Sequence, residues 1–269
     1  MMQTAERTDA KARYEKDGFF LATEPLIPRD LVEKAIQGMD AIRRGEYDTG
    51  RPPAPSMWNP GDDPTKLCKM EQPQFASRAV MKLVSHPALG EMAARITGAR
   101  MIQAWWVQLL YKPSSAGASG TNIGFHQDRS YWKVWEEGSE LFTAWVALSD
   151  VQEDCGPMRF VRGSHRWGLS DRSDFFEQNV DGQRHNFNLP GGADWVEVPA
   201  ILQPGAASFH HNLTLHGSGP NQSGRPRRSF AIHLRTENAR PVGGRREGLA
   251  QFIDDPDSCP VLFGRLMGS

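Results

Sequence analysis

The segment His126-Gln127-Asp128, followed ninety positions later by His216, contains the residue types that bind a redox-active metal ion. On an extended segment, side chains two positions apart point to the same face, so His126 and Asp128 can reach one ion together. A histidine from a distant strand would complete a facial triad of two histidines and one carboxylate, which leaves about three sites of an octahedral iron(II) ion open. Such a site suits oxygen activation. Imidazole and carboxylate favour iron or manganese, and no cysteine lies near either motif.

An isolated His-x-Asp is common by chance, so the surrounding residues decide its meaning. Four blocks of residues accompany the two motifs, at 108–113, 125–132, 148–165 and 216–227. They include Leu148-Ser149-Asp150, Cys155-Gly156-Pro157-Met158, Val161-Arg162-Gly163-Ser164-His165 and His216-Gly217-Ser218-Gly219-Pro220-Asn221. Together, over roughly residues 10 to 235, they resemble the phytanoyl-CoA dioxygenase family of iron and 2-oxoglutarate dependent oxygenases. Cys155 stands where that family often has Asn, and Arg162 where it usually has Pro.

The resemblance implies a reaction and a set of ligands. His126, Asp128 and His216 would bind iron(II) and form the catalytic centre. With O2, the cosubstrate 2-oxoglutarate would be decarboxylated to succinate and carbon dioxide while an unactivated C–H bond of the substrate is hydroxylated. Relatives that halogenate have a small residue at the carboxylate position, so Asp128 favours hydroxylation, although desaturation or ring formation can use the same chemistry.

The distal carboxylate of 2-oxoglutarate needs a cation, and two adjacent arginines compete for that role. Arg227 and Arg228 begin a predicted strand and must point to opposite faces, and periodicity alone does not decide between them. The family places its arginine eleven positions after the distal histidine, which here is Arg227. Ser218, Gln108 and Lys112 match positions of further cosubstrate or substrate contacts in relatives, although Lys112 would also fit a solvated strand end.

Aromatic and histidine residues near these motifs have less specific meanings. Aromatic residues at strand spacing are more often core than ligand-binding, and only Trp132, close after the ligand pair, is assigned to the substrate pocket. His210 and His211 are adjacent, so only one can face the interior and support the metal ligands.

The elements that must position these residues change in character along the chain. Apolar residues at helical spacing follow Pro28 up to Ile42, and further helical stretches lie near 75–83 and 88–96, the last stopped by Gly98. Residues 51–64 are rich in proline and predict an irregular ordered loop that could cover the site. Short strands are predicted at 101–110, 141–148, 158–161, 195–198, 206–210 and 229–235.

Helices first and many short strands later predict an α+β, mainly β chain. We expect a double-stranded β-helix (a cupin-like jelly roll) with the N-terminal helices packed outside. Residues 1–269 are expected to form a single dioxygenase domain, with a helical part at about 8–98, a jelly-roll core at about 100–236 and a C-terminal extension at 237–269.

Composition excludes several classes of partner. The net charge of −1 argues against a nucleic-acid surface, and no apolar run approaches the ~18 residues of a membrane span. A polar N-terminus and three widely spaced cysteines predict a cytoplasmic, reducing environment with free thiols. The expected partner is a small-molecule substrate, and the expected assembly is a monomer or homodimer.

Two alternatives from other classes remain open. A cupin-like metal enzyme that does not use 2-oxoglutarate would need no arginine near the end of the last strand. A non-catalytic jelly roll that binds a ligand would have an inert metal site. The sequence does not choose a substrate, and the arginines near the C-terminus fit either a solvated basic face or an anion site.

Overall fold

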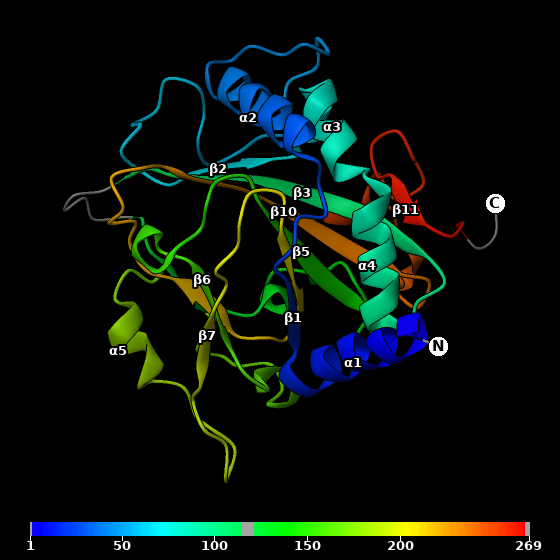
Figure 1. Ribbon diagram of the computed structural model, residues 1–269, viewed down its shortest axis with the longest axis vertical. Helices are drawn as coiled ribbons and strands as arrows, with labels where there is room; N and C mark the ends of the chain where they lie inside the picture. The colour runs from blue at the N-terminus through cyan, green and yellow to red at the C-terminus, as the bar shows by residue number, and fades with distance from the viewer. Residues whose placement is uncertain (1, 115–120, 267–269) are drawn as a thin grey trace.

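The computed structural model describes residues 2–114 and 121–266. Its strands form two antiparallel sheets that face each other (Figure 1). The large sheet has the strand order β1 (Phe19–Ala22), β8 (Ala207–His211), β5 (Leu141–Ala147), β10 (Arg227–Thr236), β3 (Ile102–Lys112) and β11 (Val261–Phe263), and β2 (Cys68–Glu71) also pairs with β3. The small sheet has the order β4 (Ile123–His126), β9 (His216–Ser218), β6 (Met158–Val161) and β7 (Glu197–Pro199). The predicted jelly-roll fold is confirmed.

Four of the helices cover the outer face of the large sheet: α1 (Met2–Asp17), α2 (Arg29–Arg43), α3 (Arg78–Val84) and α4 (Pro87–Thr97) (Figure 1). α2 buries one apolar stripe, which includes Leu31, Ala35 and Met39, because residues three and four apart share a helix face. The stripe belongs to the same core as Phe209 and Phe230 of the sheet. The fifth helix, α5 (Val180–Arg184), is close to β4 of the small sheet.

Short 3-10 helices connect several of these elements, at Pro73–Phe75, Asp128–Ser130, Glu153–Cys155, Ser164–Arg166, Val242–Gly244 and Gly248–Ala250. Among the described residues, no helix is both long and apolar enough to cross a membrane.

Strand β10 alternates between the two faces of the large sheet. Its outward side chains Phe230, Ile232 and Leu234 pack in the core beneath the helices. Arg228 points the same way, and its Nη2 lies 3.4 Å from Asp40 Oδ2 on α2. Among the alternate residues, Arg227, Ala231 and His233 line the interior between the sheets. The period-two argument predicted only that the two arginines point to opposite faces.

Some elements differ from the sequence prediction. The helical stretch expected at 75–83 is a 3-10 turn followed by α3, which begins after Ser77 because the Ser77 hydroxyl accepts a hydrogen bond from the Val80 amide. α4, in contrast, ends at Gly98 as predicted, and Gly98 has a left-handed backbone with φ of 79°. The strands β1, β2 and β11 were not predicted, and β11 ties the C-terminal segment to the edge of the large sheet.

Candidate metal centre

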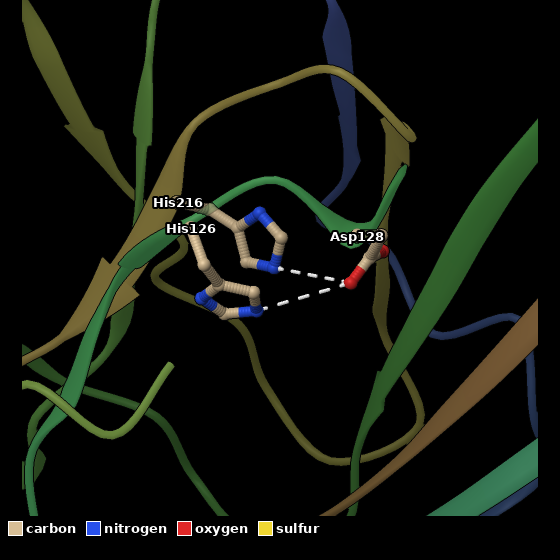
Figure 2. A group of neighbouring side chains, drawn as sticks. All are labelled: His126, Asp128 and His216. Atoms are coloured by element: carbon tan, nitrogen blue, oxygen red, sulfur yellow. Dashed lines mark ion pairs between the residues drawn. The ribbon is translucent and has the colours of Figure 1, made fainter. Parts of the chain in front are cut away.

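Three side chains converge between the sheets at the end of β4, the start of a 3-10 turn and the start of β9. Ligand atoms of His126, Asp128 and His216 all lie within 4.8 Å of one another. Each imidazole Nε2 is 3.8 Å from Asp128 Oδ1 (Figure 2). The pairing of β4 with β9 places the two histidines opposite each other. Asp128 begins a turn instead of continuing the strand, but Gln127 is extended, so the side chains still meet.

Both histidines are oriented by their own backbone. His126 Nδ1 lies 2.8 Å from the Gly124 carbonyl oxygen, and His216 Nδ1 lies 2.9 Å from that of Thr214. A carbonyl only accepts hydrogen bonds, so each Nδ1 carries the hydrogen and each Nε2 has a free lone pair. Burial lowers the pKa of both imidazoles, which keeps them neutral at pH 7. This donor set fits a divalent transition-metal ion.

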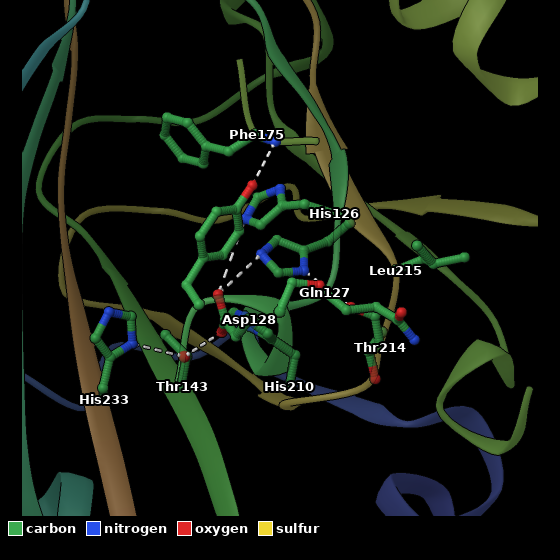
Figure 3. A network of polar contacts seen from close by, with 12 residues as sticks. His126, Gln127, Asp128, Thr143, Phe175, His210, Thr214, Leu215 and His233 are labelled. Atoms are coloured by element: carbon green, nitrogen blue, oxygen red, sulfur yellow. Dashed lines mark hydrogen bonds and ion pairs between the residues drawn. The ribbon is translucent and has the colours of Figure 1, made fainter. Parts of the chain in front are cut away.

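Asp128 is held through its other oxygen. Oδ2 accepts a hydrogen bond of 2.7 Å from the Thr143 hydroxyl and one of 3.2 Å from His210 Nε2 (Figure 3). The Thr143 oxygen in turn lies 2.9 Å from His233 Nδ1, which can donate to it. These contacts follow from strand register, since Thr143 on β5 lies between His210 on β8 and His233 on β10.

The ionisation of Asp128 follows from these contacts. Burial alone would raise its pKa, but the hydrogen bond from His210 and the nearby imidazoles hold the pKa well below the ordinary value. Asp128 is therefore a carboxylate with Oδ1 directed at the two histidines. The sequence had suggested that one of His210 and His211 faces the interior, and it is His210; the contacts of Thr143 and His233 were not predicted.

The cavity beside these residues extends to Arg227 on β10. Gln108, Ser218 and Arg227 line it together with the triad. Arg227 is 1% exposed, and its guanidinium donates to Ser218 Oγ at 3.0 Å and to the Gly156 carbonyl, whereas its buried Nε has no hydrogen-bond partner. Lys112 lies behind this wall, where its Nζ donates to Ser218 Oγ at 2.5 Å and to the Gly219 carbonyl at 2.6 Å.

Burial disfavours the charged form of both side chains. Burial, reinforced by Arg227, holds the pKa of Lys112 well below its ordinary value, and burial lowers the pKa of Arg227 to about 10. Within residues 2–114 and 121–266, neither cation has a carboxylate ion-pair partner. Buried cations without an anionic partner indicate a site for an anionic ligand.

Two aromatic residues occupy places that the sequence did not indicate. Trp132, expected in the substrate pocket, is 3% exposed and packs with its ring centroid 4.8 Å from that of His233, outside the set of residues that line the cavity. Phe175 does line the cavity, with its ring 5.0 Å from that of His126. It lies in the polar segment 171–194, where no periodic pattern marks an inward side chain.

The chain is similar in sequence to known proteins. The family model described as phytanoyl-CoA dioxygenase matches residues 14–229. An ectoine dioxygenase from Bordetella parapertussis is 27% identical over 248 residues, which cover 86% of this chain and 76% of that protein. A probable alpha-ketoglutarate-dependent hypophosphite dioxygenase from Stutzerimonas stutzeri is 25% identical over 185 residues, 68% of this chain and 62% of that protein's length.

Solved structures share the fold. The alpha-ketoglutarate dependent epimerase SnoN from nogalamycin biosynthesis superimposes with a TM-score of 0.69 at 23% identity, over 88% of this chain and 86% of that one. The carbocyclase SnoK from the same biosynthesis gives a TM-score of 0.66 at 21% identity, over 87% of this chain and 85% of that one. At this level of identity, the likeness concerns the fold.

Proposed function

The chain belongs to the phytanoyl-CoA dioxygenase family, and we propose that it hydroxylates an unactivated C–H bond of a small-molecule substrate. Membership makes it a dioxygenase that depends on iron(II) and 2-oxoglutarate and consumes O2. One observation supports the proposal most strongly. His126, Asp128 and His216 converge in a cavity whose other end contains Arg227, a buried cation with no carboxylate partner in the described parts of the chain.

Each of these residues has a proposed role. His126 Nε2, His216 Nε2 and Asp128 Oδ1 would hold the iron, which when bound supplies the redox chemistry that couples cosubstrate decarboxylation to substrate oxidation. Arg227 and Ser218 would bind the distal carboxylate of 2-oxoglutarate, because a guanidinium and a hydroxyl both donate hydrogen bonds to it.

The remaining predicted contacts take supporting roles in this proposal. Lys112 fixes the Ser218 hydroxyl and adds positive charge behind it. Gln108, on β3, lines the cavity. Trp132 packs against His233, which lines the cavity, so Trp132 would affect the substrate indirectly, by positioning His233. Apolar side chains around the triad, among them Leu110 and Met158, keep water away and limit how a substrate can lie.

Product analysis tests the proposal. The protein with iron(II), 2-oxoglutarate and O2 should form succinate, and His216→Ala should form none. In a metabolite screen, a product heavier by one oxygen atom supports hydroxylation, whereas loss of two hydrogens points to desaturation or ring closure. Substrate oxidation without succinate would favour a metal enzyme that does not use 2-oxoglutarate, and an inert protein would favour a ligand-binding jelly roll.

We also propose that the chain forms a single domain and works in a reducing compartment. We expect it to have no nucleic-acid or membrane partner. Cys68, Cys155 and Cys259 are all free and buried, which suits a reducing environment. The Cys155 thiol lies 3.1 Å from the Gln152 carbonyl and closes its local turn, where relatives often have Asn.

A further inference from the structure

Residues 174–178, here named the strap, run along the open edge of β4, the edge strand of the small sheet. The Gly124 amide donates to the Phe175 carbonyl at 3.0 Å, and the Asp174 amide donates to the Phe125 carbonyl at 3.2 Å. The Phe175 amide donates to the Tyr131 hydroxyl at 2.9 Å. The strap is therefore an ordered wall at the mouth of the candidate site, and its Phe175 lies beside His126 (Figure 3).

Phe175 lines two neighbouring cavities. On one side it lines the cavity that contains the triad and Arg227. On the other side it lines an outer cavity, bounded by the strap and by residues 57–69. The inner cavity must also accommodate 2-oxoglutarate, so most of a substrate larger than an amino acid would lie in the outer one.

The outer cavity has aromatic and apolar walls that face solvent. Met57 is 71% exposed and Phe176 is 53% exposed, while Trp58 is buried in the wall. Exposed large apolar side chains gathered at a rimmed cavity are typical of a ligand site. The wall is ordered: the Trp58 indole donates to the Asp63 carbonyl at 3.2 Å, and the Asn122 side-chain Nδ2 donates to the carbonyl of Gln178 in the strap at 2.7 Å.

The charges in these walls balance. Asp62 and Asp63 line the outer cavity together with Lys66 and Lys69, so its walls carry no net charge. Lys69 forms an ion pair with Glu71, and Asp63 accepts hydrogen bonds from the amide and the hydroxyl of Thr65. Such walls offer apolar surface and single hydrogen bonds, which suit an uncharged ligand better than a strongly charged one.

We propose that the outer cavity is the substrate-recognition site and takes a flat, uncharged molecule with an aromatic or fused-ring body and few polar substituents. Phe175 and Phe176 contact the faces of that body, and Phe175 sets which edge reaches the triad. Aromatic rings attract one another in offset-stacked or edge-to-face contacts, so flat aromatic substrates gain most from these walls. This inference rests on the proposed function, since it assigns the substrate class of the same site.

Binding of the uncharged fluorescent probe N-phenyl-1-naphthylamine tests the inference. The protein is loaded with Mn²⁺ and 2-oxoglutarate, and probe emission is titrated in the wild type and in Phe176→Ala. We expect roughly tenfold weaker probe binding in the variant, because an aromatic contact surface is lost. Phe176 is half exposed, so the substitution leaves the core intact. Leu169→Ala is the matched control, because Leu169 is 58% exposed and lies outside both cavities.

The outcomes separate the inference from the proposed function. Equal probe affinity in Phe176→Ala and the wild type would overturn the inference, and so would equally tight binding of the flat dianion naphthalene-1,5-disulfonate. A loss of probe binding in Leu169→Ala would show that the probe reports general surface apolarity, which also counts against it. Calorimetric titration of the wild type with 2-oxoglutarate and Mn²⁺ tests the proposed function separately, since no cosubstrate binding would refute that function whatever the probe does.

Discussion

The two oxygens of Asp128 have different surroundings, and this difference determines how a metal ion can be bound. Oδ2 is occupied by hydrogen bonds from Thr143 and His210, whereas Oδ1 faces the two imidazoles. A carboxylate held in this way would offer only Oδ1 to a metal ion. Together with the two imidazoles it would supply three ligand atoms, a donor set that suits iron(II) oxygenase chemistry.

Removing the Thr143 hydroxyl should loosen this arrangement. Thr143→Val keeps the shape of the side chain but breaks the hydrogen bonds to Asp128 Oδ2 and His233, and we expect Mn²⁺ affinity to fall by roughly tenfold. Thr143→Ser keeps the hydroxyl and should bind almost as the wild type does. Calorimetric titration measures both. If the Val variant bound Mn²⁺ as tightly as the Ser variant, the hydroxyl would have no part in orienting Asp128.

Substitutions of the two adjacent arginines should have different effects, one on cosubstrate affinity and the other on fold stability. Arg227→Ala should weaken 2-oxoglutarate binding by roughly tenfold to a hundredfold, the range for a lost charged hydrogen bond. Arg228→Ala should leave that affinity unchanged and cost roughly 1 kcal/mol of stability or less, since its side chain pairs with Asp40 on the outer face. Titration calorimetry and urea unfolding distinguish the two. A large loss of cosubstrate affinity in Arg228→Ala alone would refute the assignment.

Short motifs allowed part of the site to be predicted. His126, Asp128 and His216 were singled out by residue type and spacing, and the structure brings them together. Their roles as ligands stay predictions. Thr143 and His233 could not be found in this way, because their contact depends on the register between β5 and β10, which lie far apart in sequence. Period-two alternation from Arg227 to His233 was the one available signal.

At the scale of elements, long periodic segments were predictable, whereas short strands were predicted only in part: β6 and β7 were expected at 158–161 and 195–198, and three others were missed. Strand β3 carries apolar residues on both faces, which is typical of a strand buried on both sides, and it was placed nearly to its ends. Strands β1, β2 and β11 have three or four residues, too few to show a period. The strap has no periodicity, because backbone hydrogen bonds to β4 and not an apolar stripe hold it in place.

The contact between β4 and the strap depends on Gly124. A Cβ at this position would lie 2.2 Å from the Asp174 carbonyl oxygen and 2.8 Å from Glu177 Cβ. Gly124→Ala should therefore push the strap away from β4 and cost roughly 1–3 kcal/mol. Limited proteolysis should then cut within 171–190 much faster than in the wild type. Gly191→Ala, where nothing lies within 4 Å, is the control, and equal cleavage of the two variants would contradict a packed strap.

At the scale of the whole molecule, the two sheets enclose a group of buried imidazoles. His126, His210, His216 and His233 are all at most 5% exposed. Burial lowers the pKa of His233 to about 4, from an ordinary value of 6.5. In the unfolded chain the same imidazole is protonated near pH 6.5, so the unfolded state binds more protons between pH 6.5 and 4.

The metal-free protein should consequently lose stability as the pH falls. The contribution of His233 is fully present above pH 6.5 and is lost progressively as the pH falls toward about 4. A shift of this size corresponds to roughly 3 kcal/mol. Urea unfolding from pH 7.5 to 4.5 measures how the free energy of unfolding changes with pH. This pH dependence should be weaker in His233→Gln. An identical pH dependence in the variant would show that His233 is protonated in the folded state over this range.

The central claim is that one site binds iron(II) through His126, Asp128 and His216 and binds 2-oxoglutarate beside it. The most direct measurement is an anaerobic titration of the protein with both, followed by visible absorption. We predict a weak charge-transfer band that needs iron(II) and 2-oxoglutarate together and that is absent in His126→Ala. A wild-type protein without the band, or a His126→Ala variant that keeps both the band and full iron affinity, would contradict the account.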